Sequence, residues 1–505
     1  MIVYSPKVEV RLVKAIKRQY LVPDVPVAAI RYGTLDAIDL TPYLSQIGGV
    51  QTSKSCREPA GGFSITLADK PHIADTTTDH NISMYETLYA LIEPMDLVEI
   101  RMAHNPVDYA TSEWDYKIPV IMRGFVSAVT RNEMMNAGVP SRSVTIAGQD
   151  MGKILNIIQI FYLYNSQLAE NYLTEFRFFQ KYGFEGDAKI KTAIEFTTDI
   201  IKNVINPYLK RLTAMANGES VGAKVMTSWT PAITIQGVVS PLTISTFNNV
   251  SLYQLLATVL DVGPWNELYV EDTKDGVQMV GRPAPFLSVA GEAIQGVKPE
   301  EVKIDSKDVV AMNVARSDAN VANYYWVQNE RWGWYTNEVG RLLAMDEQAG
   351  KNGSTFIKFD YPNSDAARYG VRKLEVTSVL GPPDYLFADS VKKQDDAKQT
   401  ASLMSWVEDR RRVLAEINQD NVVFESGTMR LRGNEKIRAG MQLVLSRGKS
   451  VVSSYYVVRV SHEFIPFQGF FTNVIVERGT NFISRAQSDS PVYFKEMDGG
   501  GVRNA

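Results

Sequence analysis

Two strand-rich stretches of this 505-residue chain resemble each other, and an internal repeat restricts the possible folds more than any single motif does. Four candidate strands, each recognised by alternating apolar and polar residues, match in order. The matched ranges are 63–69 with 427–432, 95–102 with 441–447, 120–130 with 455–463, and 142–147 with 471–476. A turn precedes the last strand of each set, Asn136-Ala137-Gly138 in one and 466–469 in the other. The repeat predicts two copies of one small β-barrel, and a ring of three such chains would present six copies.

The rest of the chain is expected to form further domains around these barrels. At about 100 to 200 residues per domain, the length predicts three or four domains. Apolar residues at three- and four-residue steps predict helices at 151–164, 171–182, 188–212 and 251–260, and a charge-rich helix is expected at 397–417. The predicted fold class is α+β, mainly β, with two related barrels and a mixed helical and β region inserted between them. The predicted domains are 1–150 (first barrel), 151–300 (mixed helical and β), 301–420 (connecting region with an aromatic hairpin and the charged helix), 421–485 (second barrel) and 486–505 (flexible tail).

Charge and cysteine content exclude several classes of protein. Lys and Arg number 53 against 57 Asp and Glu, a formal charge of −4, so no electrostatic excess favours wrapping nucleic acid or lying on an anionic membrane. The longest apolar run, 154–164, is far shorter than the roughly 20 residues that span a bilayer, so no stable membrane insertion is expected. Cys56 is the single cysteine. It is expected to be a buried, inert thiol in a protein made in a reducing cytosol.

The sequence offers no motif that carries catalysis, and no catalytic, cofactor-binding or metal site is predicted. The four histidines include no pair at the i, i+4 spacing of a helical zinc site. Residues 218–222 fit G-x-S-x-G, but a polar helical stretch precedes them where a nucleophile elbow needs a strand, and His462 would be the only base and is expected inside a strand. Paired carboxylates have no fixed linear spacing, so a cell-wall hydrolase remains open.

An aromatic cluster is the other candidate site. Its members are Tyr324, Tyr325, Trp326, Trp332, Trp334 and Tyr335. One interpretation is a hairpin that turns at 329–331 and packs its aromatic side chains across the two strands. The others are a protein interface and a platform for sugar rings.

The order of these pieces resembles the baseplate hub proteins of contractile-tailed bacteriophages and the related hub part of type VI secretion spike proteins. The matching stretches are the barrel end at 143–150 and the helical start at 153–155, then 251–260 with the extended exit 282–286, then 314–318 with Val321 and Asn323, and finally 432–434, 437–440, 455–460 and 461–464. The resemblance covers most of the chain, and 331–420 matches worst.

The resemblance implies a homotrimer whose tube-type barrels, two per chain, form a pseudo-six-fold ring. Such a ring would join the hexameric tail tube, or a tube initiator protein, to the trimeric central spike within the virion baseplate, beside other baseplate proteins. Phage DNA would pass through its lumen without specific binding, and a near-neutral to acidic chain fits such a channel because many cationic contacts would retain the DNA. The family pattern carries over no catalytic residues.

Partner contacts are expected at two places. The fused spike or lysozyme domain of some relatives is missing, so the spike is expected to be a separate protein that orders the C-terminal segment around Val492, Tyr493 and Phe494. Trp326, Trp332 and Trp334 complete the candidate partner interface. The alternatives to a structural hub are a tail-associated cell-wall hydrolase and a carbohydrate-binding tail module.

Overall fold

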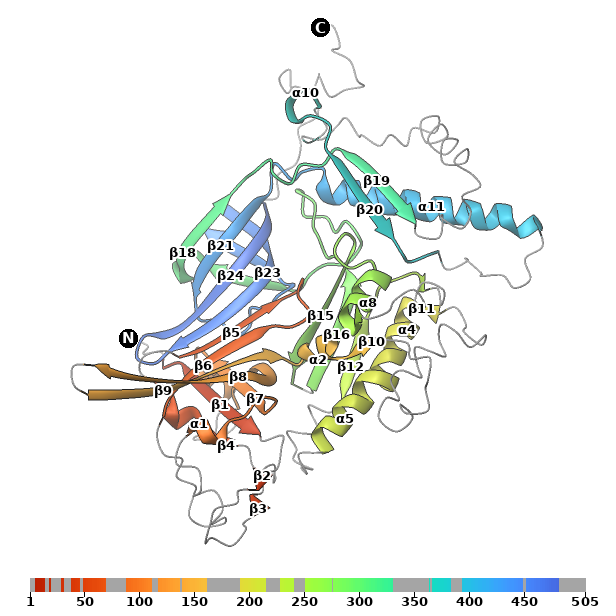
Figure 1. The fold of residues 1–505 in the computed structure, drawn as a ribbon. Helices are drawn as coiled ribbons and strands as arrows, with labels where there is room; N and C mark the ends of the chain where they lie inside the picture. Colours follow the sequence, from red (N-terminus) through yellow and green to blue (C-terminus); the bar gives the residue numbers. More distant parts are fainter. Residues whose placement is uncertain are drawn as a thin grey trace, which may run out of the picture.

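The protein is mainly β, with a large curled, mostly antiparallel sheet and few helices (Figure 1). The computed structural model describes residues 5–13, 18–19, 29–30, 38–45, 49–69, 88–110, 117–136, 139–160, 191–214, 228–239, 250–274, 276–329, 363, 366–382, 393–447 and 451–480. The sheet consists of two sets of strands, one from each end of the chain, joined edge to edge.

The first strand set lies in the order β5-β6-β9-β8-β7-β1-β4. Its strands are β1 (Lys7–Val13), β4 (Ile38–Asp39), β5 (Val50–Ser55), β6 (Gly62–Ala68), β7 (Leu97–Ala103), β8 (Val120–Asn136) and β9 (Val139–Asp150). Strict alternation in β1 and β6 places Val10, Ile65 and Leu67 in a dry core, because successive side chains of a strand point to opposite faces. Short elements accompany this set: β2 (Arg18–Gln19), β3 (Ala29–Ile30), η1 (Thr41–Tyr43), α1 (Leu88–Leu91) and η3 (Pro106–Tyr109).

The second strand set lies in the order β18-β21-β24-β23-β22-β17. Its strands are β17 (Glu301–Asp305), β18 (Val309–Ala315), β21 (Glu425–Arg432), β22 (Gln442–Arg447), β23 (Val451–Ile465) and β24 (Gly469–Thr480), with η6 (Ser306–Asp308) between the first two. It has a core of its own, which includes Met429, Leu443 and Val474. The sequence predicts a connecting region over 301–420, whereas β17 and β18 lie in this sheet.

The two sets share one strand order, and the four expected strand matches are present in the ladders. β6-β9-β8-β7 corresponds to β21-β24-β23-β22, and a fifth pair, β5 with β18, continues the match at one edge. β1 and β17 occupy the opposite edge but differ in direction, since β1 runs antiparallel to β7 and β17 runs parallel to β22. Residues 316–424 interrupt the second set between its second and third strands.

A matching β-bulge fixes the alignment of the two sets. The β8–β9 ladder is interrupted between Val126 and Ala128, and the β23–β24 ladder between Val457 and Arg459. Val126 therefore corresponds to Val457, and Val120 to Val451. The expected match of 120–130 with 455–463 was wrong in register by several residues, because β23 begins four residues earlier than the sequence pattern indicated.

Contacts just outside the ladders repeat as well. The Met95 N–H donates to the Val126 oxygen (2.8 Å), and the Gly440 N–H donates to the Val457 oxygen (2.8 Å). Both donors have a positive φ, 73° for Met95 and 82° for Gly440, a conformation that is uncommon for methionine. Two chain segments with little sequence similarity thus share strand order, bulge position and a rare backbone conformation.

The two strand sets are joined by β5 and β23 (Figure 1). Six residue pairs form this antiparallel joint, from Ser55 opposite Arg459 to Val50 opposite Phe464. Thr52 and His462, which lie opposite each other in it, are 2% and 4% exposed. One face of the joint is therefore buried in the interior of the protein.

Helices, a three-stranded sheet (β12-β16-β15) and two two-stranded sheets (β10-β14 and β11-β13) form the middle region. The strands of this region are β10 (Gln159–Ile160), β11 (Lys191–Thr192), β12 (Trp229–Ile233), β13 (Val238–Val239), β14 (Val250–Ser251), β15 (Asn266–Thr273) and β16 (Gly276–Pro283). Its helices are α2 (Lys153–Ile157), α4 (Ala193–Ile200), the π-helical turn η5 (Ile201–Ile205), α5 (Asn206–Ala214) and α8 (Leu252–Val259). Capping boxes at Thr192 and Ser251 start α4 and α8.

Two helix predictions from the sequence are confirmed here and one is wrong. The helices expected at 188–212 and 251–260 are present as α4 to α5 and as α8. The helix expected over 151–164 ends at Ile157, because Gln159 and Ile160 pair with β14. The period of a short apolar run does not by itself distinguish a helix from a strand. Residues 171–182 lie outside the described residues.

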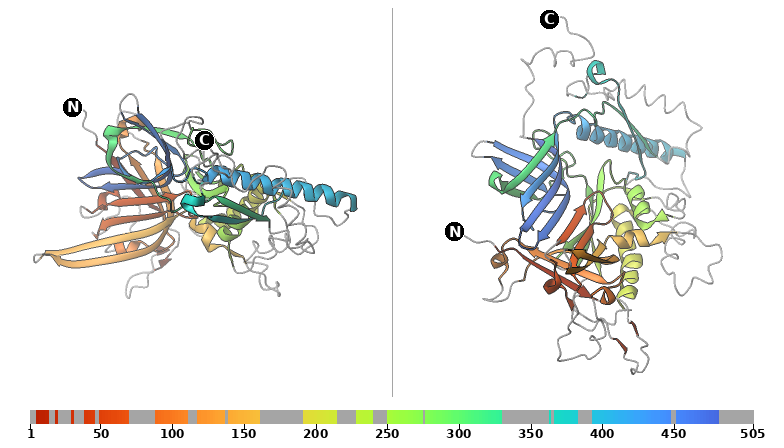
Figure 2. Two further views of the ribbon diagram at one scale, coloured as in Figure 1. Left: turned by 90° about the horizontal axis from the view of Figure 1, so that it is seen from above. Right: turned by 60° about the vertical axis from the view of Figure 1, so that its left-hand side comes forward.

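The stretch between β18 and β21 contributes β19 (Tyr324–Asn329), α10 (Ala366–Tyr369), β20 (Lys373–Ser378) and α11 (Lys393–Asn418). The charge-rich helix expected at 397–417 is α11, and it packs beside β19 (Figure 2). β19 pairs in parallel with β20, and the hairpin turn expected at 329–331 falls outside the described part of the chain beyond Asn329.

Candidate functional site

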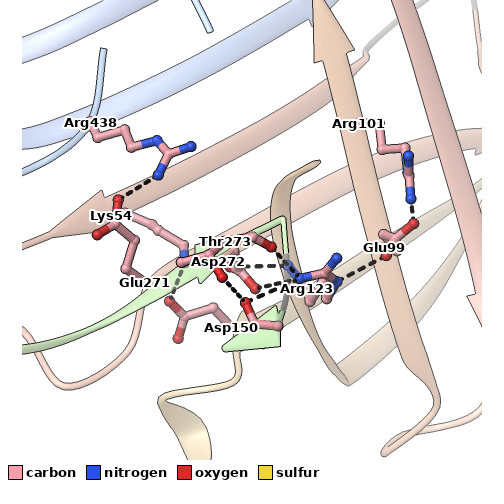
Figure 3. A network of polar contacts seen from close by, with 10 residues as sticks. Lys54, Glu99, Arg101, Arg123, Asp150, Glu271, Asp272, Thr273 and Arg438 are labelled. Atoms are coloured by element: carbon pink, nitrogen blue, oxygen red, sulfur yellow. Dashed lines mark hydrogen bonds and ion pairs between the residues drawn. The ribbon is translucent and has the colours of Figure 1, made fainter. Parts of the chain in front are cut away.

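A buried ionic network lies where the first strand set meets the β15–β16 hairpin (Figure 3). The Lys54 ammonium on β5 contacts Asp272 Oδ2 on β15 at 2.5 Å and Asp150 Oδ2 on β9 at 3.4 Å. The two carboxylate side chains are 2% and 3% exposed, so both need charge compensation. Lys54 contacts both of them, and Arg123 Nη1 lies 3.8 Å from Asp272 Oδ1.

Arg123 on β8 connects the same hairpin to β7. Its Nε donates to Glu99 Oε2 at 2.9 Å, and its Nη1 donates to the backbone oxygen of Thr273 at 3.1 Å. Glu99 also accepts from Arg101 Nε at 2.7 Å. Because the Arg123 guanidinium bonds both a carboxylate on β7 and the turn of the hairpin, it fixes the position of the hairpin against β7 and β8.

The pKa shifts in the network follow from burial and pairing. Burial lowers the pKa of Lys54, but the charges of Asp272 and Asp150 outweigh it and the net shift is upward. Burial raises the pKa of Asp150 although Lys54 acts against it. For Glu99, burial is outweighed by Arg101 and Arg123, and its pKa is lowered. Lys54 and Glu99 are thus held in their charged forms.

The second strand set contacts the same hairpin and the first set. Arg438 Nη1 lies 2.7 Å from Glu271 Oε1 on β15. Glu435 accepts from the His104 backbone N–H at 3.0 Å and from the Tyr109 hydroxyl at 2.7 Å. Burial and the Glu435 carboxylate raise the pKa of Tyr109, so its hydroxyl stays protonated and keeps donating. The network therefore holds three parts of the chain in one arrangement.

The space beside this network is small. The cavity lined by Lys54, Asp150, Asp272 and Arg438 has a volume of about 40 Å³, which suits ordered water rather than a sugar ring. The chemistry available to the network is therefore charge pairing between chain segments.

A larger groove, of about 440 Å³, lies on the second strand set and β5. Most of its polar lining is uncharged: Gln51, Ser53, Asn313, Thr428, Ser461 and Asn473. Its two cations are paired, Arg430 with Glu463 at 3.2 Å and Arg459 with Glu58. In the first strand set, the corresponding positions of β6, β8 and β9 carry Ser64, Thr66, Thr130 and Thr145, again without charge. The sequence alone does not predict this face, since only the alignment of the ladders shows which residues share it.

The structure places one of the predicted interface residues. Trp326 lies on β19, partly buried, with Lys373 Nζ at 5.5 Å from its ring centroid. Trp332, Trp334, Val492, Tyr493 and Phe494 lie outside the described residues, so the contact of this set with a partner stays a prediction.

His462 and Cys56 both lie at the β5–β23 joint. His462 is on β23 as expected, its Nδ1 lies 3.1 Å from Thr472 Oγ1, and burial lowers its pKa to about 4. The Cys56 thiol is buried and donates to the Val458 oxygen, and burial raises its pKa. A protonated thiol without access to solvent is unreactive. The motif at 218–222 lies outside the described residues.

No three His, Cys, Asp or Glu side chains in the described part of the chain gather to hold a metal ion. No described helix combines the length and the apolar character that crossing a membrane requires.

Comparison with known proteins finds similarity only at the level of structure. No family profile matches the chain. No curated protein matches it either. A tail protein from Neisseria meningitidis MC58 is 9% identical with a TM-score of 0.42, covering 94% of this chain and 97% of that one. The 43 kDa tail protein of prophage MuSo2 from Shewanella oneidensis is 9% identical with a TM-score of 0.38, covering 94% and 96%.

A third similar structure is the c3393 protein of E. coli, a component of the type VI secretion system. It is 6% identical with a TM-score of 0.35, covering 87% of this chain and 75% of that one. The structural neighbours are thus phage tail proteins and type VI secretion components, the two groups that the sequence resembles.

Proposed function

We propose that this protein is the structural baseplate hub of a contractile phage tail. Three subunits form a pseudo-six-fold ring that joins the hexameric tail tube to the trimeric central spike. The observation that carries the proposal is the pair of matching strand sets in one chain, with equal strand order and an equivalent bulge. A subunit with two copies of one barrel is what adapts a three-fold partner to a six-fold one.

The buried ionic network supports this role. A hub keeps its two barrels at a fixed angle, and here charged contacts link both strand sets to the β15–β16 hairpin. Charges this deeply buried are costly unless fully paired, so they favour one arrangement of the segments over many.

The groove face, which is mostly uncharged and whose two arginines are paired, supports a role as the wall of a DNA channel. Cationic side chains bind phosphate and release counterions, so a wall rich in them would retain the DNA. On this face the two arginines of the second set are paired with glutamates, and the first set presents hydroxyl groups. The site of action is then the virion tail, and the protein acts without catalysis or a cofactor.

Light scattering of the purified chain, alone and with its spike protein, tests the proposal. A three-subunit mass and class averages with six similar lobes are the expected result. A chain that stays monomeric with every tube and spike partner would refute the hub. Zymography on peptidoglycan tests the alternative of a cell-wall hydrolase, and we expect no clearing.

A further inference from the structure

When the two strand sets are aligned, two sheet edges lack, within the described residues, the paired strand that the corresponding edge of the other set has. In the first set, the edge of β5 opposite β6 is paired with β23. In the second set, β18 corresponds to β5, and within the described residues no strand pairs with its edge opposite β21. Likewise, β23 beyond its bulge is paired with β5, whereas β8 beyond its bulge pairs only with β9 in the part of the chain described.

Residues at the two unpaired edges are more exposed than the residues at the corresponding paired positions, as expected where a neighbouring strand is missing. Thr52 on β5 is 2% exposed, while its counterpart Val314 on β18 is only partly buried. His462 on β23 is 4% exposed, while its counterpart Arg131 on β8 is exposed. The β8–β9 hairpin extends past the rest of the sheet (Figure 2). Natural proteins seldom leave a long, apolar edge strand such as 309–315 uncovered.

We propose that β18 of one subunit pairs antiparallel with residues 127–133 of β8 in the next subunit, reproducing between chains the β5–β23 joint within the chain. This inference rests on the proposed ring and names the surface that closes it. The joint is heterologous, since each subunit contributes its β18 edge to one neighbour and its β8 edge to the other. A ring of three subunits, in which internal and external joints alternate, then contains six barrels.

The alignment of the two sets gives the register of the external joint. Since Ser55, Lys54, Ser53 and Thr52 lie opposite Arg459, Val460, Ser461 and His462, their counterparts pair in the same order. Ser317 then lies opposite Ala128, Arg316 opposite Val129, Ala315 opposite Thr130, and Val314 opposite Arg131 of the partner subunit.

The direction of the backbone groups follows from the internal joint. The Cys56 N–H donates to the Val458 oxygen at 3.1 Å, so alternate residues from Thr52 to Cys56 turn their polar groups toward β23, and Ser53 turns away. By the same alternation the N–H of Val314 points out of the subunit. Ala315 and Thr130 then form a pair without mutual hydrogen bonds, whose Cα atoms lie about 4.5 Å apart in antiparallel sheets.

Disulfide trapping tests this register, because a Cα separation of about 4.4 to 6.8 Å permits a disulfide. We expect the double variant Ala315→Cys/Thr130→Cys to give a covalent trimer on a non-reducing gel after mild oxidation. Cys56 is buried and should not compete. Ser53→Cys/Ser461→Cys, the corresponding pair within the chain, is the positive control and should close an internal disulfide without raising the mass. Ala315→Cys/Asn132→Cys, out of register by two residues, is the negative control.

The outcomes separate this inference from the proposed function. A ring seen by light scattering that Ala315→Cys/Thr130→Cys fails to trap overturns the strand pairing and leaves the hub intact. A ladder of species larger than three subunits supports the pairing and overturns the closed ring. Absence of any assembly, with or without the spike, overturns both.

A proline pair gives a test that does not depend on oxidation. Val314→Pro removes only an outward N–H, and an edge strand tolerates proline there, so the subunit should keep its Tm while trimer formation falls at least tenfold. Thr52→Pro, the same change at the corresponding internal position, should lower the Tm. Unchanged trimer formation by Val314→Pro would contradict the proposed joint.

Discussion

At the scale of single residues, we expect the buried Arg123 to contribute more to the stability of the fold than an exposed arginine does. Its side chain is 4% exposed and contacts Glu99 and Thr273. Arg123→Met leaves Glu99 without this donor in a buried site, and breaking a buried pair in this way costs about 3 to 5 kcal/mol. We expect a markedly lower Tm in thermal unfolding. Arg412→Met, which removes exposed pairs on α11, should cost less than about 1 kcal/mol, and equal effects of the two changes would contradict the role assigned to Arg123.

His462 makes stability depend on pH in a predictable direction. Its pKa falls from 6.5 to about 4 on folding, so between these values the unfolded chain binds a proton that the folded chain does not. Stability from this residue is therefore complete above pH 6.5 and is lost as the pH falls toward 4, by about 1.4 kcal/mol per pH unit at most. Thermal unfolding at pH 7 and at pH 5 measures this loss. When the pH falls from 7 to 5, the His462→Leu variant should lose less stability than the wild type. Equal losses would mean that His462 is not the titrating group.

At the scale of elements, Gly440 and Met95 have the same backbone conformation at corresponding positions of the two strand sets, but only the surroundings of Gly440 require a glycine. Both have a positive φ and donate to corresponding strands. A Cβ on Gly440 would lie 2.5 Å from Arg282 Nη2 and 2.9 Å from the Tyr269 hydroxyl oxygen. Gly440→Ala therefore adds a steric clash to backbone strain, and we expect it to cost about 2 to 4 kcal/mol.

Gly370 is the matched control for this prediction. It also has a positive φ, 72°, but nothing lies within 4 Å of the Cβ position. Gly370→Ala should show the backbone strain alone, about 1 kcal/mol. If thermal unfolding shows the same loss for both variants, crowding by Arg282 is not the cause.

Element by element, the sequence predicted what depends on local alternation and missed what depends on distant neighbours. The period of two in 63–69 or 471–476 is visible in a single strand, so four strand matches could be found. The β5 and β18 match was missed because 50–55 and 312–317 share little beyond Lys54 and Arg316, each followed by serine. Lys54, Asp150 and Asp272 come from three distant parts of the chain, and no spacing reveals that they meet.

At the scale of the whole molecule, the groove face makes a prediction about DNA passage that separates assembly from transport. Thr428→Arg and Thr145→Arg add unpaired cations to the face opposite the apolar cores and touch neither sheet edge of the proposed joint. The ring should therefore assemble as before. If this face lines the channel, each subunit contributes two new cations, six per ring, and phosphate contacts of that number bind DNA strongly at low salt.

The measurement is the rate of DNA release from virions that carry this double variant, followed with a DNA-binding dye at two salt concentrations. We expect slower release at low salt and recovery at high salt, because screening and counterion release weaken each phosphate contact as ionic strength rises. Val371→Arg, at a site 69% exposed and away from the strand sets, controls for charge alone and should leave release unchanged. Normal release by the double variant in fully assembled virions would place the groove face outside the channel. The ring could then stand, but its lumen would be lined by another surface.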